Sequence, residues 1–292
     1  SEYIIQTVGL TKRYGEKTAV KQLNLTIRKG EVFGLLGPNG AGKTTTTLML
    51  LGLTDPTEGF ATIEGRDCTR DPIGVKRVVG YLPDNVGFYG DMTGRENLYF
   101  TGRLNGLPEE VIRERTEMLL ERVGMTEAAD MKTKTYSRGM RQRLGIADVL
   151  LKDPKVIIMD EPTLGIDPQG MRDLLSLIRE LSEKDGRTIL LSSHQLYQVQ
   201  QICDRVGIFV SGSLIACGTI AELGKQMERE GKYVLELAAE PDNEALSRLL
   251  SGIEGVDGIE REGESFLIHS RMDLRRRVTM GLTANGYTLL GL

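Results

Sequence analysis

The sequence has no tryptophan, only 5% aromatic residues, and three cysteines scattered at Cys68, Cys203 and Cys217. An odd number of cysteines without metal-like spacing argues against a disulfide framework or a zinc site. We therefore expect them to be small buried apolar residues in a reducing compartment. No apolar run approaches the length of about 18 residues that a membrane-spanning helix needs, and the N-terminus has no signal-type apolar stretch. If this protein works at a membrane, another chain must span it.

The charge and composition also restrict the possible classes of protein. The net charge of −4 and the pI near 5.5 argue against a dominant nucleic-acid-binding surface. With 40% hydrophobic and 27% charged residues, the chain is typical of a globular protein. Its 292 residues are enough for one large domain and a small one.

Short apolar runs alternate with helical patterns over most of the chain. Four continuous apolar runs, at 32–36, 156–159, 188–191 and 206–210, are typical of strands buried on both faces. A helical stretch rich in Arg, Glu and Leu begins near residue 94. The pattern predicts an α/β core in a first domain, residues 1–224, interrupted by a helical subdomain at about 94–150.

The pattern changes after a polar junction at about 224–231. Residues 231–292 alternate as strand, helix, two strands, helix and strand. This βαββαβ order predicts a small α+β domain with the ferredoxin-like fold. Its role could be regulatory or dimerising, or it could passively support the first domain.

One motif carries the clearest chemistry. The segment GPNGAGKT has the spacing G-x-x-x-x-G-K-[ST] and lies between the apolar run 32–36 and a helical pattern, which is the context of a phosphate-binding P-loop rather than an accidental glycine turn. Its glycines let backbone N–H groups surround a phosphate, the lysine adds a positive charge, and Thr44 offers a hydroxyl to Mg²⁺. The predicted nucleotide-binding residues are Gly37, Pro38, Asn39, Gly40, Ala41, Gly42, Lys43, Thr44 and Thr45.

A second motif, KVIIMDEP, ends an apolar strand with two carboxylates. We expect Asp160 to reach the Mg²⁺ shell and Glu161 to polarise an attacking water. Alone, this pair could be a solvated strand end. Beside a P-loop, it predicts nucleotide hydrolysis rather than binding only.

With these motifs, residues 3 to 222 resemble the nucleotide-binding subunit of ATP-binding cassette (ABC) transporters. The segment YSRGMRQRL matches the family signature, usually LSGGQ; TKRYGEKTAV matches the loop whose aromatic residue stacks on adenine; LGIDP and LLSSH match the loops that face the partner subunit and the γ-phosphate. The resemblance implies these roles for Ser137, Arg138, Gly139 and Met140 (signature), Tyr14 (adenine), Asp167 (partner-facing loop) and His194 (γ-phosphate).

The resemblance also implies an assembly. In this family two ATPase subunits, identical or different, pack head to tail, and each ATP lies between one chain's P-loop and the other's signature. The positive end of the helix after Ser137 would face the partner's γ-phosphate. The implied cofactors are ATP and Mg²⁺, and the implied partner is a transmembrane permease. The implied location is cytoplasmic, at the inner face of the cell membrane, without nucleic acid.

Two departures from the family pattern stand out. Asp84 replaces the usual glutamine of the loop that links the metal to the membrane partner, and an aspartate can still bind Mg²⁺ directly or through water. In the signature, Arg138 replaces a glycine and Met140 a glutamine. The acidic residue at 84 is similar to those of exporter-type cassettes for drugs, sodium or copper-related maturation. The segment 85–98 is the expected docking surface, with a plain surface loop as the alternative.

Two other classes remain as alternatives. A soluble ABC-type ATPase acting on ribosomes would carry two cassettes in one chain, and one acting on DNA would carry long coiled-coil insertions. A P-loop protein that only binds nucleotide would not need Glu161 or His194.

Overall fold

The computed structural model describes residues 2–229, 233–263 and 265–291. The chain divides into two compact units, Ser1–Thr219 and Ile220–Leu292. Helix α8 (Ile220–Arg229) begins the second unit, so this division precedes the expected end of the first domain at 224. Of the junction expected at 224–231, residues 230 and 231 lie outside the described residues.

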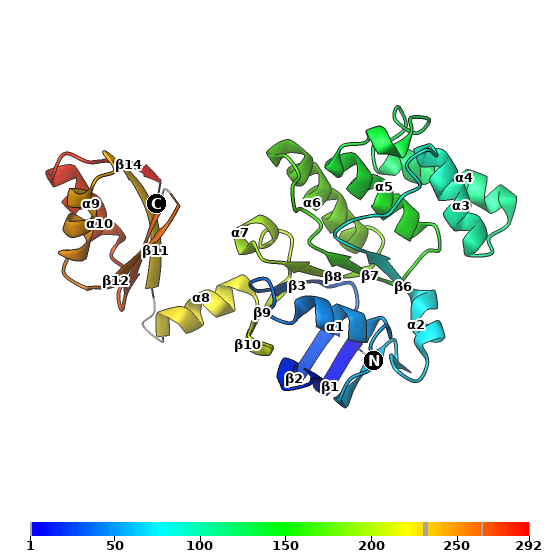
Figure 1. Cartoon of the computed structure of the whole chain (residues 1–292), viewed down its shortest axis with the longest axis horizontal. Coiled ribbons are helices and arrows are strands. Elements are labelled where there is room, and N and C mark those ends of the chain that lie inside the picture. Colours follow the sequence, from blue (N-terminus) through cyan, green and yellow to red (C-terminus); the bar gives the residue numbers. More distant parts are fainter. Residues whose placement is uncertain (1, 230–232, 264, 292) are drawn as a thin grey trace. The chain divides into compact units, whose positions relative to one another are not determined.

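The first unit is built on a six-stranded sheet with the order β10-β9-β3-β8-β7-β6 (Figure 1). Neighbouring strands from β9 to β6 run parallel, and β10 is antiparallel to β9. Every residue of β3 and β7 is buried, which explains their continuous apolar sequences. The strands are β3 (Val32–Leu36), β6 (Val79–Leu82), β7 (Val156–Asp160), β8 (Thr188–Ser193), β9 (Arg205–Val210) and β10 (Ser213–Gly218). The four strands predicted from apolar runs are confirmed.

A second sheet was not predicted. It is antiparallel, with the order β2-β1-β4-β5, and its strands are β1 (Tyr3–Tyr14), β2 (Lys17–Arg28), β4 (Glu58–Ile63) and β5 (Arg66–Asp67). One hydrophobic core joins both sheets: Ile5 and Ile63 pack in the same cluster as Phe33 and Ile158. This core therefore fixes the β1–β2 hairpin beside the parallel sheet.

Helices connect the parallel strands, so the carboxyl ends of β3, β6, β7 and β8 share one edge. Helix α1 follows β3, α2 precedes β6, and α6 lies between β7 and β8. Their bounds are α1 (Lys43–Leu50), α2 (Pro72–Val78), α6 (Pro168–Glu183) and the short α7 (Leu196–Val199). Functional side chains are therefore expected at this edge.

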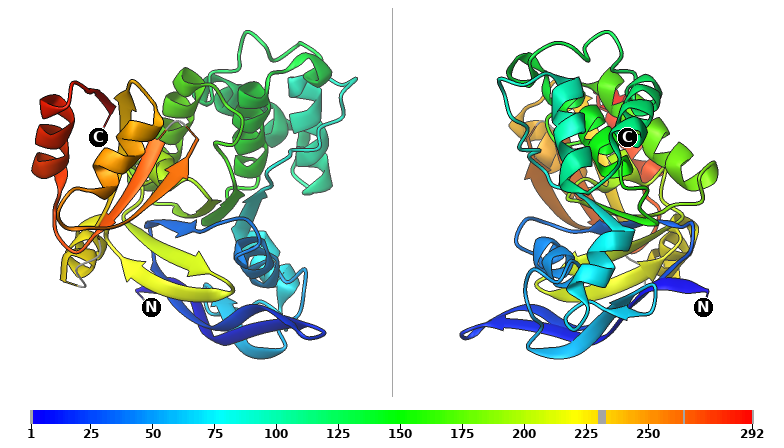
Figure 2. Two further views of the ribbon diagram at one scale, coloured as in Figure 1. Left: turned by 60° about the vertical axis from the view of Figure 1, so that its left-hand side comes forward. Right: turned by 90° about the vertical axis from the view of Figure 1, so that its right-hand side faces the viewer.

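The predicted helical subdomain is present between β6 and β7 (Figure 2). It contains α3 (Gly94–Leu104), α4 (Glu109–Arg122), a 3₁₀ turn η1 (Thr133–Thr135) and α5 (Arg138–Leu150). Thr93 and Glu96 form a capping box that starts α3. The buried amide of Asn97 bonds both the N–H and the C=O of Tyr89, which holds the preceding loop against α3.

The second unit has the predicted ferredoxin-like order. Its sheet order is β12-β13-β11-β14, with every neighbouring pair antiparallel. The elements are β11 (Tyr233–Glu240), α9 (Glu244–Ser251), β12 (Val256–Glu262), β13 (Ser265–Ser270), α10 (Arg275–Ala284) and β14 (Thr288–Gly291). Leu246 and Leu250 of α9 and Val278 of α10 pack with Leu237 and Ile268 of the sheet, so both helices cover one face.

The three cysteines do not share the expected buried environment. Cys68 is buried, but Cys203 is half-buried and Cys217 is exposed, and all three are free. Within the described ranges, no group of three or more His, Cys, Asp or Glu side chains could hold a metal ion, and no helix combines the length and apolarity needed to cross a membrane.

Candidate nucleotide-binding site

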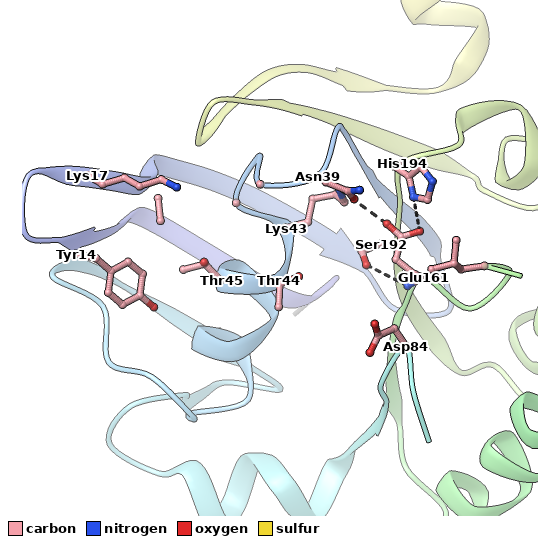
Figure 3. A pocket seen from close by; sticks show the side chains of 14 residues that line it. Tyr14, Lys17, Asn39, Lys43, Thr44, Thr45, Asp84, Glu161, Ser192 and His194 are labelled. Atoms are coloured by element: carbon pink, nitrogen blue, oxygen red, sulfur yellow. Dashed lines mark hydrogen bonds and ion pairs between the residues drawn. The ribbon is translucent and has the colours of Figure 1, made fainter. Parts of the chain in front are cut away.

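A cleft of about 540 Å³ lies at the carboxyl edge of the parallel sheet, beside the β1–β2 hairpin (Figure 3). It joins segments that are far apart in the sequence: the hairpin, the P-loop, the loop after β6 and the ends of β7 and β8. The lining residues are Tyr14, Lys17, Ala19, Asn39, Gly40, Gly42, Lys43, Thr44, Thr45, Asp84, Glu161, Leu164, Ser192 and His194. Of the predicted P-loop residues, Gly37, Pro38 and Ala41 shape the loop without lining the cleft.

Two P-loop glycines are required by close backbone approach. A Cβ atom at Gly37 would lie 2.2 Å from the carbonyl oxygen of Phe209, and one at Gly42 would lie 2.4 Å from that of Ala19. Gly42 also has φ of 110°, a conformation that side chains disfavour. Any larger residue would push the loop away from β9 and β2.

The start of α1 supplies donors for an anion. Hydrogen bonding along this helix begins with the amide of Thr46, which donates to Gly42 at 3.0 Å. In the part of the chain that the structure describes, the amides of Lys43, Thr44 and Thr45 have no acceptor. Free N–H groups at a helix N-terminus form a favourable phosphate site.

Lys43 is 6% exposed, and its ammonium lies inside the P-loop. Nζ donates to the carbonyls of Gly37 (2.5 Å) and Pro38 (3.0 Å), and lies 4.0 Å from Oε1 of Glu161. Burial lowers the pKa of Lys43, and the charges of Glu161 and Asp160 partly oppose that shift. A polyanion would offer this desolvated cation a stronger partner than the two carbonyls.

Asp160 is almost completely buried beneath the cleft, and three hydroxyl groups hold its carboxylate. Oδ1 accepts from Ser192 (2.8 Å) and Thr47 (3.3 Å), and Oδ2 accepts from Tyr81 (2.8 Å). Burial raises the pKa of Tyr81, and its bond to Asp160 raises it further. The sequence analysis did not predict these three hydroxyl residues. The only sequence signal for Ser192 is that it belongs to the two serines that precede His194.

The donor set fits a hard divalent cation. An oxygen of a carboxylate offers two lone-pair directions, so Oδ1 of Asp160 is fully used while Oδ2 keeps one. Thr44 is exposed with its hydroxyl toward the cleft, and Asp84 also lines it. Hydroxyl and carboxylate oxygens are the ligands that Mg²⁺ prefers, so Thr44, Asp160 and Asp84 could hold the ion directly or through water.

Glu161 and His194 form a pair at the ends of β7 and β8. Nδ1 of His194 lies 2.9 Å from Oε2 of Glu161 (Figure 3). Glu161 has φ of 44°, which is rare for a residue with a side chain. Its amide donates to the backbone carbonyl of Ser192 at 3.0 Å. This backbone turn brings the carboxylate into the cleft, where it can accept a proton from water. Within the described residues, the other nitrogen of His194, Nε2, has no hydrogen-bond partner.

Tyr14 lies at the opposite end of the cleft and is 51% exposed. The ammonium of Lys12 lies 5.0 Å from its ring centroid, a cation–π contact that occupies one face of the ring. Because Tyr14 lines the cleft and is half exposed, its ring can stack on a planar base. Lys17, on the next strand, adds a positive side chain to the cleft and was not predicted.

The signature residues lie outside this lining. Ser137 caps α5, with its Oγ accepting from the amide of Met140 at 3.2 Å, and Ser137 and Arg138 are exposed. Asp167 caps α6 by accepting from the amide of Gly170 at 3.2 Å. Among the described residues, the structure therefore gathers Tyr14, the P-loop, Asp84, Glu161 and His194 in one cleft, while the signature residues and Asp167 do not line it.

Comparisons with known proteins agree with this geometry. The family model for the ABC transporter matches residues 20–164. The chain is 37% identical to the linearmycin resistance ATP-binding protein of Bacillus subtilis (strain 168), over 88% of this chain and 81% of that one. It is 39% identical to a bacitracin transport ATP-binding protein of Bacillus licheniformis, over 98% and 92%, and 38% identical to the daunorubicin/doxorubicin resistance ATP-binding protein of Streptomyces peucetius, over 92% and 81%.

Solved structures show the same fold. The structure of cbiO1 from Clostridium perfringens, part of the transporter complex cbiONQ, superposes with a TM-score of 0.71 at 30% identity, covering 79% of this chain and 94% of that one. The chain therefore belongs to the ABC transporter family. It is an ATP-binding subunit of this family and an ATPase.

Proposed function

We propose that this ABC subunit hydrolyses Mg²⁺-ATP at two composite sites in a head-to-tail dimer and thereby powers export through a separate transmembrane permease. Each cleft supplies Tyr14 to stack on the base, the P-loop to bind the phosphates, and Glu161 with His194 for hydrolysis. The signature of a second subunit completes the site. The observation that carries this proposal is that the start of α5, capped by Ser137, is exposed, and that none of the four signature residues lines the cleft of its own chain.

The chemistry of the cleft follows from its residues. The amides that begin α1 and the ammonium of Lys43 bind and orient the phosphates. When bound, Mg²⁺ supplies positive charge to the β- and γ-phosphates. Glu161 takes the proton of the attacking water, while His194 holds this carboxylate through Nδ1 and contacts the γ-phosphate through Nε2.

Opening of the dimer after hydrolysis follows from lost contacts. The γ-phosphate is the group that both subunits would hold, so its removal takes away the interactions that favour the closed dimer. Tyr14 contributes to binding of the base rather than to this switch, because a base stacks equally before and after hydrolysis.

The permease is proposed to dock on the segment 85–98, with the chain lying at the inner face of the cell membrane. Tyr89 is 57% exposed and packs edge-on against Phe100 at 5.1 Å between ring centroids. Asn97 holds the backbone of Tyr89 in place. A fixed aromatic on a braced loop suits protein docking better than a plain surface loop does.

Export is favoured over other roles by the relatives. Their names describe drug resistance, bacitracin transport and Nod factor export, and none of these three classes is a ribosomal or DNA-acting protein. We propose that the second unit is a regulatory or dimerising accessory domain. The bacitracin transport relative aligns over 287 residues of this chain, so the alignment includes this unit.

The Glu161→Gln variant tests the proposal. Loss of the base should lower the ATPase rate by about 100-fold or more, while ATP still binds because the phosphate contacts remain. Size-exclusion chromatography with light scattering should then show a dimer in Mg²⁺-ATP and a monomer without nucleotide. Glu180→Gln is the control and should behave like the wild type, because this half-exposed glutamate on α6 pairs only with Lys184 of the same helix among the described residues and does not line the cleft. Hydrolysis by Glu161→Gln at the wild-type rate would refute the assignment.

A further inference from the structure

The two departures from the family pattern contact each other in the structure. The guanidinium of Arg138, at the start of α5, donates from Nη2 to the backbone carbonyl of Asp84 at 3.0 Å. The carboxylate of the same Asp84 lines the nucleotide cleft. A charged donor strengthens such a bond. The family's usual glycine at 138 has no side chain with which to make it.

The same carbonyl has a second donor on α5. The side-chain amide of Gln142, which is 1% exposed, donates to Asp84 from 3.5 Å, a long contact. Its Oε1 atom is buried without a hydrogen-bond partner among the described residues. Since Gln142 lies one turn after Arg138, two side chains on the same face of α5 hold the backbone of residue 84.

The stem of Arg138 also packs on the loop that follows β7. A Cβ atom at Gly165 would lie 3.1 Å from Cδ of Arg138 and 3.4 Å from Nε, and Gly165 has φ of 69°. The preceding residue, Leu164, lines the cleft. Arg138 therefore contacts two loops, each of which contributes a neighbouring side chain to the nucleotide site of its own chain.

We propose that Arg138 is a positioning residue that links the signature of each subunit to Asp84 in the cleft of the same subunit. This inference rests on the proposed head-to-tail function. The start of α5 contacts the partner's nucleotide, and the Arg138 side chain passes any displacement of that helix to the backbone of Asp84. Occupancy of one composite site thereby sets the position of a carboxylate in the other.

A double-mutant cycle tests this link. Arg138→Ala should lower kcat roughly three- to tenfold, as expected for the loss of one hydrogen bond of ordinary strength, while binding of ATP to the cleft of the isolated subunit, which Arg138 does not line, stays unchanged. Arg138→Lys should recover part of the rate because it keeps a cationic donor. In an Asp84→Ala background the effect of Arg138→Ala should shrink below about twofold, because Arg138 acts through residue 84.

Arg143→Ala is the matched control. It removes an arginine from the same helix, but that guanidinium pairs with Asp173 on α6 at 3.1 Å, so its effect should be the same with or without Asp84. Additive effects of Arg138→Ala and Asp84→Ala on kcat would overturn the inference. A wild-type protein that lacks ATPase activity or never dimerises with ATP would instead overturn the proposed function.

Hydrogen–deuterium exchange gives a second measurement that does not depend on turnover. In Glu161→Gln, formation of the ATP dimer should protect the amides of residues 84–87, and adding Arg138→Ala should remove this protection while the start of α5 stays protected. Equal protection of 84–87 with and without Arg138 would overturn the link. The same spectra show whether Arg138→Ala has unfolded α5.

Discussion

At the scale of single residues, Asp160 and Glu161 are adjacent but have different surroundings. Asp160 is buried and held by the three hydroxyls of Thr47, Ser192 and Tyr81. Glu161 turns into the cleft beside His194 and Lys43. The first carboxylate is suited to a fixed position in a metal shell, and the second to proton transfer with water.

Tyr81→Phe tests whether these hydroxyls tune the metal site. The change removes one donor from Asp160 and keeps the ring, so the carboxylate loses part of its fixed orientation. The Mg²⁺ concentration for half-maximal ATPase activity should rise about tenfold, the scale typical of partners that support metal ligands. The same shift should appear in Mg²⁺-dependent thermal stabilisation with nucleotide. Tyr89→Phe, with its exposed ring, should leave both midpoints unchanged; an unchanged midpoint for Tyr81→Phe would contradict this role.

The site residues that the sequence predicts belong to motifs of fixed local spacing. The P-loop, the DE pair and the signature are contiguous motifs whose chemistry depends on neighbouring residues. Tyr81, Thr47 and Lys17 carry no such motif, because they meet the site through the fold; Tyr81 and Thr47 are 79 and 113 positions away from Asp160. A tyrosine in a strand predicts burial and no particular partner.

At the scale of elements, the parallel strands were predictable because burial on both faces demands continuous apolar sequence. The antiparallel sheet was not. Strand β1 shifts its register against β2 between Tyr3 and Ile5, between Thr7 and Leu10, and on both sides of Lys12. These irregularities break the two-residue alternation that reveals a half-buried strand.

Helix α5 has different environments at its two ends. Its first residues present the signature, while Asp148 near its other end is half-buried, and its Oδ1 atom is buried without a hydrogen-bond partner within the described part of the chain. Burial raises the pKa of Asp148 to about 6, and Thr101 and Lys152 oppose the shift. The folded state therefore binds this proton more tightly than the unfolded state does.

The sign of the resulting pH effect is definite. An acid whose pKa is raised on folding stabilises the folded state fully only below its unfolded pKa. This stabilisation is lost as the pH rises through the folded pKa of about 6. The loss is at most about 3 kcal/mol on the scale of 1.36 kcal/mol per pKa unit. Asp148→Asn should therefore match the wild type near pH 4 and exceed its free energy of unfolding by roughly 1–3 kcal/mol at pH 7.5.

Urea denaturation across this pH range measures the difference. Asp55→Asn, an exposed aspartate in the same unit, is the control and should show no pH-dependent gain. A constant difference between Asp148→Asn and the wild type from pH 4 to 7.5 would show that burial of this charge does not control the stability of α5.

At the scale of the whole molecule, the first unit carries half of each proposed composite site at separate places. The cleft gathers the P-loop, Glu161 and His194, while the signature begins α5. A single chain then has both halves and no complete site. The apparent redundancy of two phosphate-binding segments is explained if each serves a different nucleotide.

Mixed dimers of two inactive variants test this central claim most directly. Gly139→Asp places a carboxylate where the partner's γ-phosphate would lie, and Lys43→Ala removes the P-loop cation; each alone should lose ATPase activity. In the heterodimer, one site joins the intact P-loop of the first variant to the intact signature of the second. Each variant carries a different affinity tag, so that heterodimers can be purified by the two tags in turn.

The account predicts that these heterodimers recover part of the wild-type ATPase rate, and that ATP promotes cross-linking between the signature of one chain and the P-loop of the other. If the signature served its own chain, every subunit would be defective and mixing would restore nothing. Verified heterodimers with neither ATPase activity nor cross-linking between subunits would contradict the head-to-tail assembly.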